Sequence, residues 1–284
     1  MAIILDGKKL AKQIHAKTLQ RVEALTDPLT LAVVYDPDNK GSELYVGMKA
    51  RAAEKVGIQT QDIPVDAHAT TADVLKIVER LNEDDHITGI LIQSPLPENV
   101  NERHIFSAVL PSKDADGLGA TNQGMLFADS PEEYTVAATP QGVMSLLREY
   151  DIETFGKQAL VIGRSQLFGR PMAALLTNAD ATVTLAHRYT PAAQLKEYLK
   201  QADIVTVGVG IPNFINGADL KPGAVVIDVG MNVVNQKATG DVDFESAEAV
   251  ASYITPVPGG VGPMTIATLL ESTVTLAENK RSHD

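Results

Sequence analysis

The sequence predicts an α/β protein with two α/β domains, the second of them a Rossmann-like, doubly wound parallel sheet. Short runs rich in β-branched residues alternate with helical patterns along the chain, as βαβ units require. In the second half, an apolar strand leads into a glycine-bearing turn and then a helix, which is typical of nucleotide-binding domains. The 284 residues also exceed what a single hydrophobic core usually organises.

In the first half, the pattern predicts strands at residues 29–35, 59–65 and 87–93, separated by helices near residues 43–56 and 71–84. Before them, residues 6–25 read as an amphipathic helix whose N-cap is Asp6. Ser42 is the expected N-cap of the next helix.

In the second half, strands are predicted at residues 159–162, 182–186, 203–207 and 224–229, again with helical spacers. Prolines within and just after residues 129–138 mark the boundary between the domains. Pro263 suits the first turn of a helix over residues 264–270. We therefore expect one domain of residues 1–138 plus 264–284, and a second of residues 139–263.

Composition excludes several function classes. The net charge of −12 argues against nucleic-acid or anionic-membrane partners. The chain has no cysteine, so disulfides, thiolate metal sites and cysteine nucleophiles are excluded. The sequence has no cluster of His, Asp and Glu with the spacing of metal ligands, so we expect no metal site. Because the start lacks a signal-peptide pattern and no apolar run is long enough for a membrane span, we expect a cytoplasmic protein.

The segment of residues 255–265, TPVPGGVGPMT, interleaves glycines with prolines. Glycine permits positive φ and a close backbone approach to a ligand, while proline fixes φ. The segment is therefore either a stiff ligand-binding loop or a tight turn between domains.

The turn of residues 163–169, GRSQLFG, joins a strand to a helix N-terminus, where free amides and the helix dipole attract phosphate. Ser165 replaces the second glycine of the usual motif, and Gly169 falls one residue late. The next strand ends in His-Arg-Tyr without the acid that binds the ribose of NAD. Arg164 and Arg188 favour NADP by pairing with its 2′-phosphate; as an alternative, both are ordinary solvated side chains.

In the first half, Tyr45 and Lys49 share one helix face because they are four residues apart. Gln93 puts an amide at the C-terminal end of a buried strand, where α/β sheets bind ligands. Residues 113–117, KDADG, add Asp114 and Asp116 in a turn. The alternatives are a solvated helix face for the Tyr/Lys pair and a plain Asp-Gly turn for the last segment.

Together these motifs resemble the bifunctional methylenetetrahydrofolate dehydrogenase/methenyltetrahydrofolate cyclohydrolase family over nearly the whole chain. The motifs that carry the resemblance are Tyr45-Val-x-x-Lys49, Gln93-x-Pro-Leu-Pro97, Lys113-Asp-x-Asp-Gly117, Gly163-Arg-Ser165, Asp228-Val-Gly230, Gly240-Asp-Val-Asp243 and Pro256-Val-Pro-Gly-Gly-Val-Gly-Pro-Met-Thr265. The resemblance implies NADP-dependent oxidation of 5,10-methylenetetrahydrofolate and hydrolysis of the methenyl product to 10-formyltetrahydrofolate. It also implies a homodimer with folate in a cleft between two domains.

The resemblance further implies roles for single residues. Lys49 is the cyclohydrolase base, hydrogen-bonded to Gln93, while Tyr45 stacks on the folate and Asp116 holds the pterin. The remaining residues it assigns to the substrate are Pro258 and Gly259, and those it assigns to NADP are Gly163, Arg164, Ser165, Arg188, Met231 and Gly262. The alternatives are a shikimate-type dehydrogenase, which leaves Lys49 unexplained, and a non-catalytic NADP sensor, which would show no folate-dependent turnover.

Overall fold

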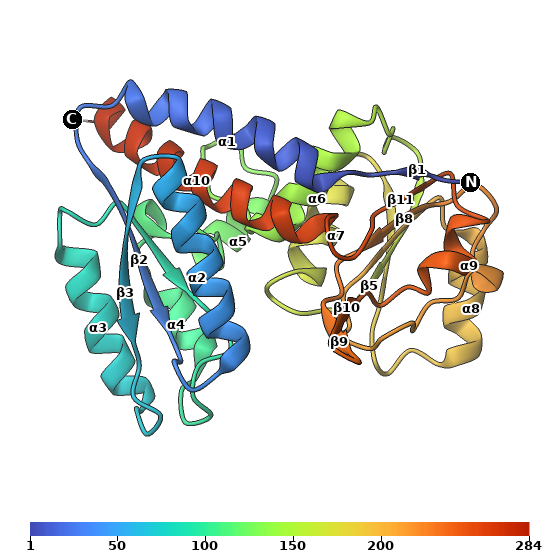
Figure 1. Ribbon diagram of the computed structural model, residues 1–284, viewed down its shortest axis with the longest axis horizontal. Coiled ribbons are helices and arrows are strands. Elements are labelled where there is room, and N and C mark those ends of the chain that lie inside the picture. The colour runs from blue at the N-terminus through green and yellow to red at the C-terminus, as the bar shows by residue number, and fades with distance from the viewer. Residues whose placement is uncertain (284) are drawn as a thin grey trace. The chain divides into compact units, whose positions relative to one another are not determined.

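The computed structural model describes the backbone of residues 1–283 and the side chains of residues 1–280, and the chain divides into two compact units (Figure 1). The six-stranded unit comprises Met1–Ala11 and Thr139–Thr265, and the three-stranded unit comprises Lys12–Ala138 and Ile266–Asp284. The N-terminus therefore groups differently from our expectation for residues 1–138. The reason is that β1 (Ile3–Ile4) pairs with β11 (Tyr253–Ile254) and so extends the six-stranded sheet.

The three-stranded unit is a parallel sheet in the order β3-β2-β4. Its strands are β2 (Leu29–Tyr35), β3 (Ile58–Pro64) and β4 (Gly89–Ile92), which confirms the predicted strands to within two residues. Both faces of β2 are buried, because alternate side chains enter different cores. Ala32 and Val34 face one core, and Leu31 and Val33 face the other.

Helices cover each face of this sheet (Figure 1). The core with Ala32 receives α3 (Thr71–Glu83) through Val74 and Val78. The other core receives Val46 from α2 and the apolar side of α10. The bounds of the remaining helices here are α2 (Lys40–Lys55), α4 (Glu102–Ala108), η1 (Pro111–Lys113), α5 (Ala120–Phe127) and α10 (Val261–His283), of which the first residues of α10 belong to the other unit.

The six-stranded unit is an all-parallel sheet in the order β1-β11-β8-β7-β5-β6. Four of its strands are β5 (Gln158–Ile162), β6 (Thr182–Ala186), β7 (Ile204–Val207) and β8 (Val225–Asp228), as predicted to within a residue at each end. The chain leaves β5 for β6 and then crosses back to place β7 on the other side of β5. This reversal confirms the Rossmann-like fold and creates the switch point where such sheets bind ligands.

The helices and the hairpin of the six-stranded unit complete its fold. Its helices are α6 (Ala138–Glu149), α7 (Gly169–Asn178), α8 (Ala192–Gln201), η2 (Gly217–Asp219) and α9 (Phe244–Glu248). The antiparallel hairpin pairs β9 (Asn232–Val234) with β10 (Lys237–Thr239).

Helix ends agree only partly with the sequence prediction. Asp6 caps α1 (Gly7–Glu23) as predicted, since its Oδ1 accepts the Lys9 N–H at 2.9 Å. Ser42 is not an N-cap: α2 begins earlier, and the side chain of Asn39 accepts the Ser42 N–H at 3.0 Å. Asparagine is one of the best capping residues, so the helix extends back to it. Within residues 1–283, no helix combines the length and apolarity that a membrane crossing needs.

Candidate active site

The predicted contact between Lys49 and Gln93 is present. Lys49 is buried on α2, and its Nζ donates to Gln93 Oε1 at 2.8 Å. Gln93 directly follows β4 and continues the sheet, since its N–H donates to the Val34 carbonyl at 2.8 Å. Its Nε2 donates to the Ser94 carbonyl at 2.9 Å, which leaves Oε1 turned to the lysine.

Burial lowers the pKa of Lys49, and the nearby charge of Asp116 opposes part of that shift. A lysine with a lowered pKa can accept a proton near neutral pH. Tyr45 lies one turn earlier on α2 and is partly buried, which raises the pKa of its phenol. The alternative of a fully solvated Tyr/Lys helix face is therefore wrong.

The turn at residues 113–117 has a separate function for each polar side chain. Lys113 Nζ donates to the carbonyls of Leu81, Asn82 and Asp84 at 2.7–2.9 Å and so satisfies the C-terminal end of α3. Asp114 is buried, and its carboxylate accepts the N–H groups of Leu118 and Gly119 and the amide of Asn122. These two side chains hold the turn in place.

Asp116 is the carboxylate of this turn that keeps an oxygen available to accept hydrogen bonds from a ligand. Its Oδ1 accepts the Ala138 N–H at 3.2 Å, and the described residues provide no hydrogen bond to Oδ2. Burial raises the pKa of Asp116 to about 6, against the lowering effect of the Lys49 charge. Because Lys49 and Asp116 affect each other's pKa, the structure brings them into one electrostatic site.

Glu102 was missed by the sequence analysis. It lies at the start of α4, and its carboxylate accepts the Ser94 hydroxyl at 2.9 Å and the Leu96 N–H at 2.6 Å. These bonds fix the segment that follows Gln93. A serine at 94 with an acid eight residues later was the available signal, but spacing alone does not show that the two side chains meet.

In the six-stranded unit, the turn after β5 lies at the switch point. Gly163 has φ +119°, and a Cβ on Gly169 would collide with the Gly163 carbonyl. The late glycine of the motif is therefore required where α7 approaches the strand end. Ser165 Oγ accepts the Phe168 N–H at 3.2 Å and closes the turn before α7.

Arg164 and Arg188 lie against the same aromatic ring. Their guanidinium carbons are 5.5 Å and 4.8 Å from the centroid of Tyr189, and Arg188 donates to the Tyr189 hydroxyl at 2.6 Å. Among the side chains of residues 1–280, neither arginine has an ion pair with a carboxylate. Two held guanidiniums without an acidic partner suit a phosphate.

The glycine- and proline-rich segment before α10 is tightly held. Gly259 has φ +112°, and its carbonyl accepts the Lys8 N–H at 2.9 Å. The peptide bond before Pro258 is cis. Just beyond, the Met231 Cε lies 3.7 Å from the Cβ position of Gly262, so these two residues predicted for the cofactor are neighbours.

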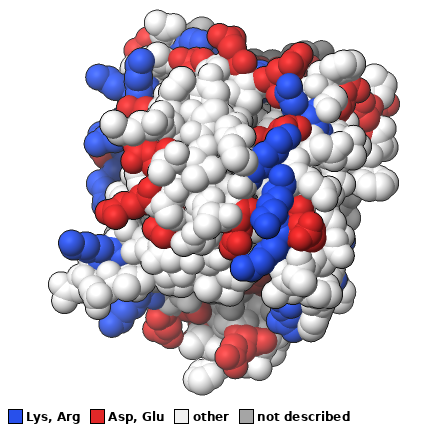
Figure 2. All heavy atoms as spheres, turned by 90° about the vertical axis from the view of Figure 1, so that its right-hand side faces the viewer, with Lys and Arg blue, Asp and Glu red and all other residues white. Residues whose placement is uncertain are grey.

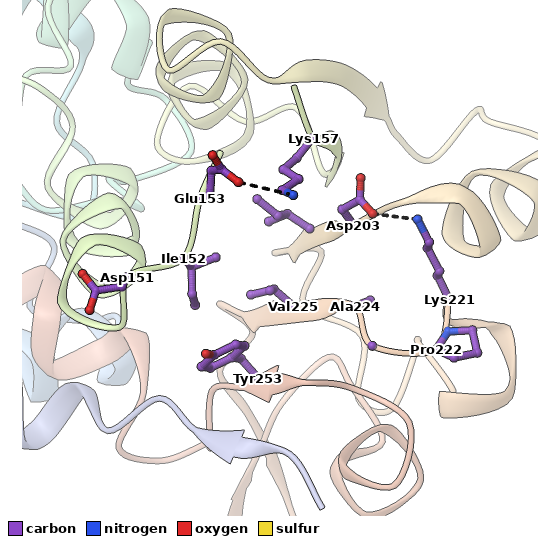
Figure 3. A pocket seen from close by; sticks show the side chains of 12 residues that line it. Asp151, Ile152, Glu153, Lys157, Asp203, Lys221, Pro222, Ala224, Val225 and Tyr253 are labelled. Atoms are coloured by element: carbon purple, nitrogen blue, oxygen red, sulfur yellow. Dashed lines mark hydrogen bonds and ion pairs between the residues drawn. The ribbon is translucent and has the colours of Figure 1, made fainter. Parts of the chain in front are cut away.

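A cavity of about 270 Å³ lies at the amino-terminal ends of β5, β7, β8 and β11 (Figure 3). Its lysines are already paired: Lys157 with Glu153 at 3.5 Å and Lys221 with Asp203 at 2.6 Å. None of the predicted site residues lines it. It is at the edge of the sheet opposite the strand ends that carry Gly163 and Asp228.

Charge is distributed without a large basic area on the face seen in Figure 2, where acidic and basic side chains are interspersed. Where the structure describes side chains, in residues 1–280, no group of three or more His, Asp or Glu is arranged to hold a metal ion.

Comparison with known proteins gives matches over both units. Residues 5–116 match the catalytic-domain model of tetrahydrofolate dehydrogenase/cyclohydrolase, and residues 137–281 match the NAD(P)-binding-domain model of the same name. The chain is 71% identical over 279 residues to "Bifunctional protein FolD" of Leuconostoc citreum (strain KM20), covering 98% of this chain and 99% of that protein.

Two solved structures show the same likeness. One is the bifunctional enzyme FolD, methylenetetrahydrofolate dehydrogenase/cyclohydrolase, of Campylobacter jejuni, with TM-score 0.94, 41% identity and coverage of 99% of this chain and 100% of that one. The other is the Trypanosoma brucei N5,N10-methylenetetrahydrofolate dehydrogenase-cyclohydrolase complexed with NADP cofactor and inhibitor. It has TM-score 0.94 and 35% identity and covers 99% of this chain and 98% of that one.

Proposed function

The chain belongs to the tetrahydrofolate dehydrogenase/cyclohydrolase family, and from this premise we propose how its residues perform the two reactions. It oxidises 5,10-methylenetetrahydrofolate with NADP and hydrolyses the methenyl product to 10-formyltetrahydrofolate. The observation that carries the residue assignment is the buried amine of Lys49. It is hydrogen-bonded to Gln93, and the charge of Asp116 acts on its pKa. A shikimate-type dehydrogenase and a non-catalytic sensor are not favoured, since neither needs this group.

In the cyclohydrolase step, water attacks the cationic methenyl carbon and must lose a proton. Lys49 accepts that proton, because burial lowers its pKa and the bound cationic substrate would lower it further. Gln93 keeps the lysine aimed by accepting its hydrogen bond at 2.8 Å. Tyr45, on the same helix face, stacks on the folate.

Asp116 anchors the pterin. Its free Oδ2 can accept the N–H and amino donors of the ring, and a charged acceptor makes such bonds strong. We also assign Pro258 and Gly259 to folate binding, because the positive φ of Gly259 and the hydrogen bond from the Lys8 N–H to its carbonyl fix the shape of that segment.

The oxidation step is mainly a matter of positioning. NADP supplies the hydride acceptor when bound, and the glycine turn after β5 fits its diphosphate because α7 begins at Gly169, where free N–H groups and the helix dipole attract phosphate. Arg164 and Arg188 hold the 2′-phosphate. The other residues assigned to the cofactor are Gly163, Ser165, Met231 and Gly262.

We further propose that the protein is a cytoplasmic homodimer. The folate-binding domain is proposed to comprise residues 1–138 plus 264–284, and the NADP-binding domain residues 139–263, although β1 pairs within the six-stranded sheet.

One assay tests this function. The protein is incubated with 5,10-methylenetetrahydrofolate and either NADP or no cofactor, and NADPH, methenyl and formyl products are followed. We expect NADPH and 10-formyltetrahydrofolate to form together. Formation of NADPH without formyl product would show that the protein lacks cyclohydrolase activity. Absence of folate-dependent NADPH formation would overturn the proposal.

A further inference from the structure

Two buried aspartates, Asp228 and Asp241, lie at the carboxyl edge of the six-stranded sheet without a cation. Asp228 ends β8, and Asp241 follows β10. The exposed fractions are 3% and 0%, and neither carboxylate forms an ion pair with the described side chains, those of residues 1–280. Buried charges of this kind need hydrogen-bond donors in place of water.

Asp241 binds the segment that leaves β7. Its Oδ2 accepts the N–H groups of Val209 at 2.6 Å and Gly210 at 2.9 Å. Its Oδ1 accepts the Ile211 N–H at 3.0 Å and the Asn232 side-chain amide at 2.9 Å. A single carboxylate therefore fixes three consecutive amides and the first residue of β9.

Asp228 holds the backbone of Asp241 by hydrogen bonds. Its Oδ1 accepts the N–H groups of Gly230 at 2.8 Å and Asp241 at 3.0 Å, and its Oδ2 accepts the Val242 N–H at 2.9 Å. A Cβ on Gly230 would collide with the Asp241 carboxylate, so the segments are packed as closely as glycine permits. The two carboxylates link the segments after β7, β8 and β10 into one clasp.

The place of the clasp in the sheet identifies what it serves, given the proposed function. A dinucleotide lies across the switch point, with its two halves over strands on opposite sides. Arg188, after β6, marks the 2′-phosphate half, and the Gly163 turn after β5 marks the diphosphate. The ends of β7 and β8, on the other side of β5, therefore receive the nicotinamide half.

We propose that Asp241, supported by Asp228, is a positioning residue for the nicotinamide half of NADP. It acts through the backbone of residues 209–211 and through the side chain of Asn232, all of which it holds by hydrogen bonds. The competing explanation is that the clasp only stabilises the fold, and it predicts no difference between ligands that do and do not carry nicotinamide.

The experiment compares NADP with 2′,5′-ADP, which keeps the 2′-phosphate half and lacks nicotinamide. Asp241→Asn preserves the size of the side chain but replaces one acceptor oxygen with a donor. We expect the Kd for NADP to rise by about tenfold or more, because NADP must then order residues 209–211, which the lost charge-assisted bond no longer fixes. The Kd for 2′,5′-ADP should stay within about twofold, and so should hydrolysis of methenyltetrahydrofolate measured without cofactor.

Asp219→Asn is the matched control, since Asp219 makes a surface pair with Lys196 at 3.3 Å; all three measurements should stay at wild-type values. Equal weakening of NADP and 2′,5′-ADP by Asp241→Asn would overturn the proposal, as would unchanged NADP binding. If Asp241→Asn does not fold, Asn232→Ala removes one bond of the clasp and must weaken NADP while sparing 2′,5′-ADP, or the proposal fails. Wild-type protein that binds neither ligand would instead overturn the cofactor assignment.

Discussion

The two units share one reversal of strand order but prepare their sites with different chemical groups. In each, the chain leaves a central strand, β2 or β5, for one neighbour and returns to the other side. The three-stranded unit puts buried, titratable side chains at this point, Lys49 and Asp116. The six-stranded unit puts a glycine turn and a helix N-terminus there, with Arg188 beside them.

The difference follows from what each site must do. Proton transfer needs a side chain whose pKa lies near the pH of the medium, and burial shifts the pKa of the side chain toward that pH. Holding a diphosphate needs several N–H donors close to the ligand, which a bare backbone provides. Single substitutions should therefore separate the two functions of this enzyme, and four predictions test how far they do.

The largest effect is expected for Lys49→Met, which keeps much of the aliphatic stem and removes the proposed base. Cyclohydrolase activity should fall by about 10²–10⁴-fold, the usual contribution of general acid–base catalysis. Oxidation needs no base at the one-carbon unit, so dehydrogenase activity should fall less and methenyl product should accumulate. The methenyl absorbance is measured against NADPH formed over time.

Lys55→Met, at the exposed end of the same helix, is the control and should leave both activities unchanged. Parallel loss of both activities in Lys49→Met, without accumulated methenyl product, would make Lys49 a substrate-positioning residue instead.

Asp116→Ala should weaken folate binding for both reactions together. Loss of charge-assisted hydrogen bonds of about 1.5–3 kcal/mol each corresponds to roughly ten- to hundredfold in affinity for each bond. NADP affinity, titrated without folate, should not change. Asp62→Ala, an exposed carboxylate on β3, serves as the control. Retained folate affinity would reduce Asp116 to a turn residue, and Asp114 could not replace it because its carboxylate is already used by the turn.

Arg188→Ser tests whether a side chain of the six-stranded unit, and not only its backbone, sets the preference for NADP. One charge-assisted contact to the 2′-phosphate is lost, so the NADP-to-NAD affinity ratio should drop by about ten- to hundredfold. Arg148→Ser, which removes an exposed arginine of α6, should leave the ratio unchanged. An unaltered ratio in Arg188→Ser would mean that Arg188 contributes only to the contact with Tyr189.

The same comparison explains what could be predicted from the sequence. The strands follow from local patterns, because a buried strand can be recognised from a few residues, whereas the pairing of Lys49 with Gln93 was expected only from the resemblance to the family. The Asp241 clasp and the Glu102 contact with Ser94 were not predicted, since they depend on loops whose meeting is set by tertiary packing. The N-cap of α2 was misplaced because Asn39 and Ser42 are both good capping residues and only the backbone decides between them.

The smallest expected effect is a pH dependence confined to the folate side. Burial raises the pKa of Asp116 to about 6 in the free protein, so its carboxylate is charged above that pH and protonated below it. Pterin donors bind the charged form better, and folate binding should therefore weaken as the pH falls through about 6, by at most about tenfold per pH unit for one proton. The KM for the folate substrate is measured between pH 5 and 8 in wild type and in Asp116→Asn, which cannot titrate. The mutant should bind weakly and without this pH dependence, whereas an equal slope in both proteins would place the titrating group elsewhere.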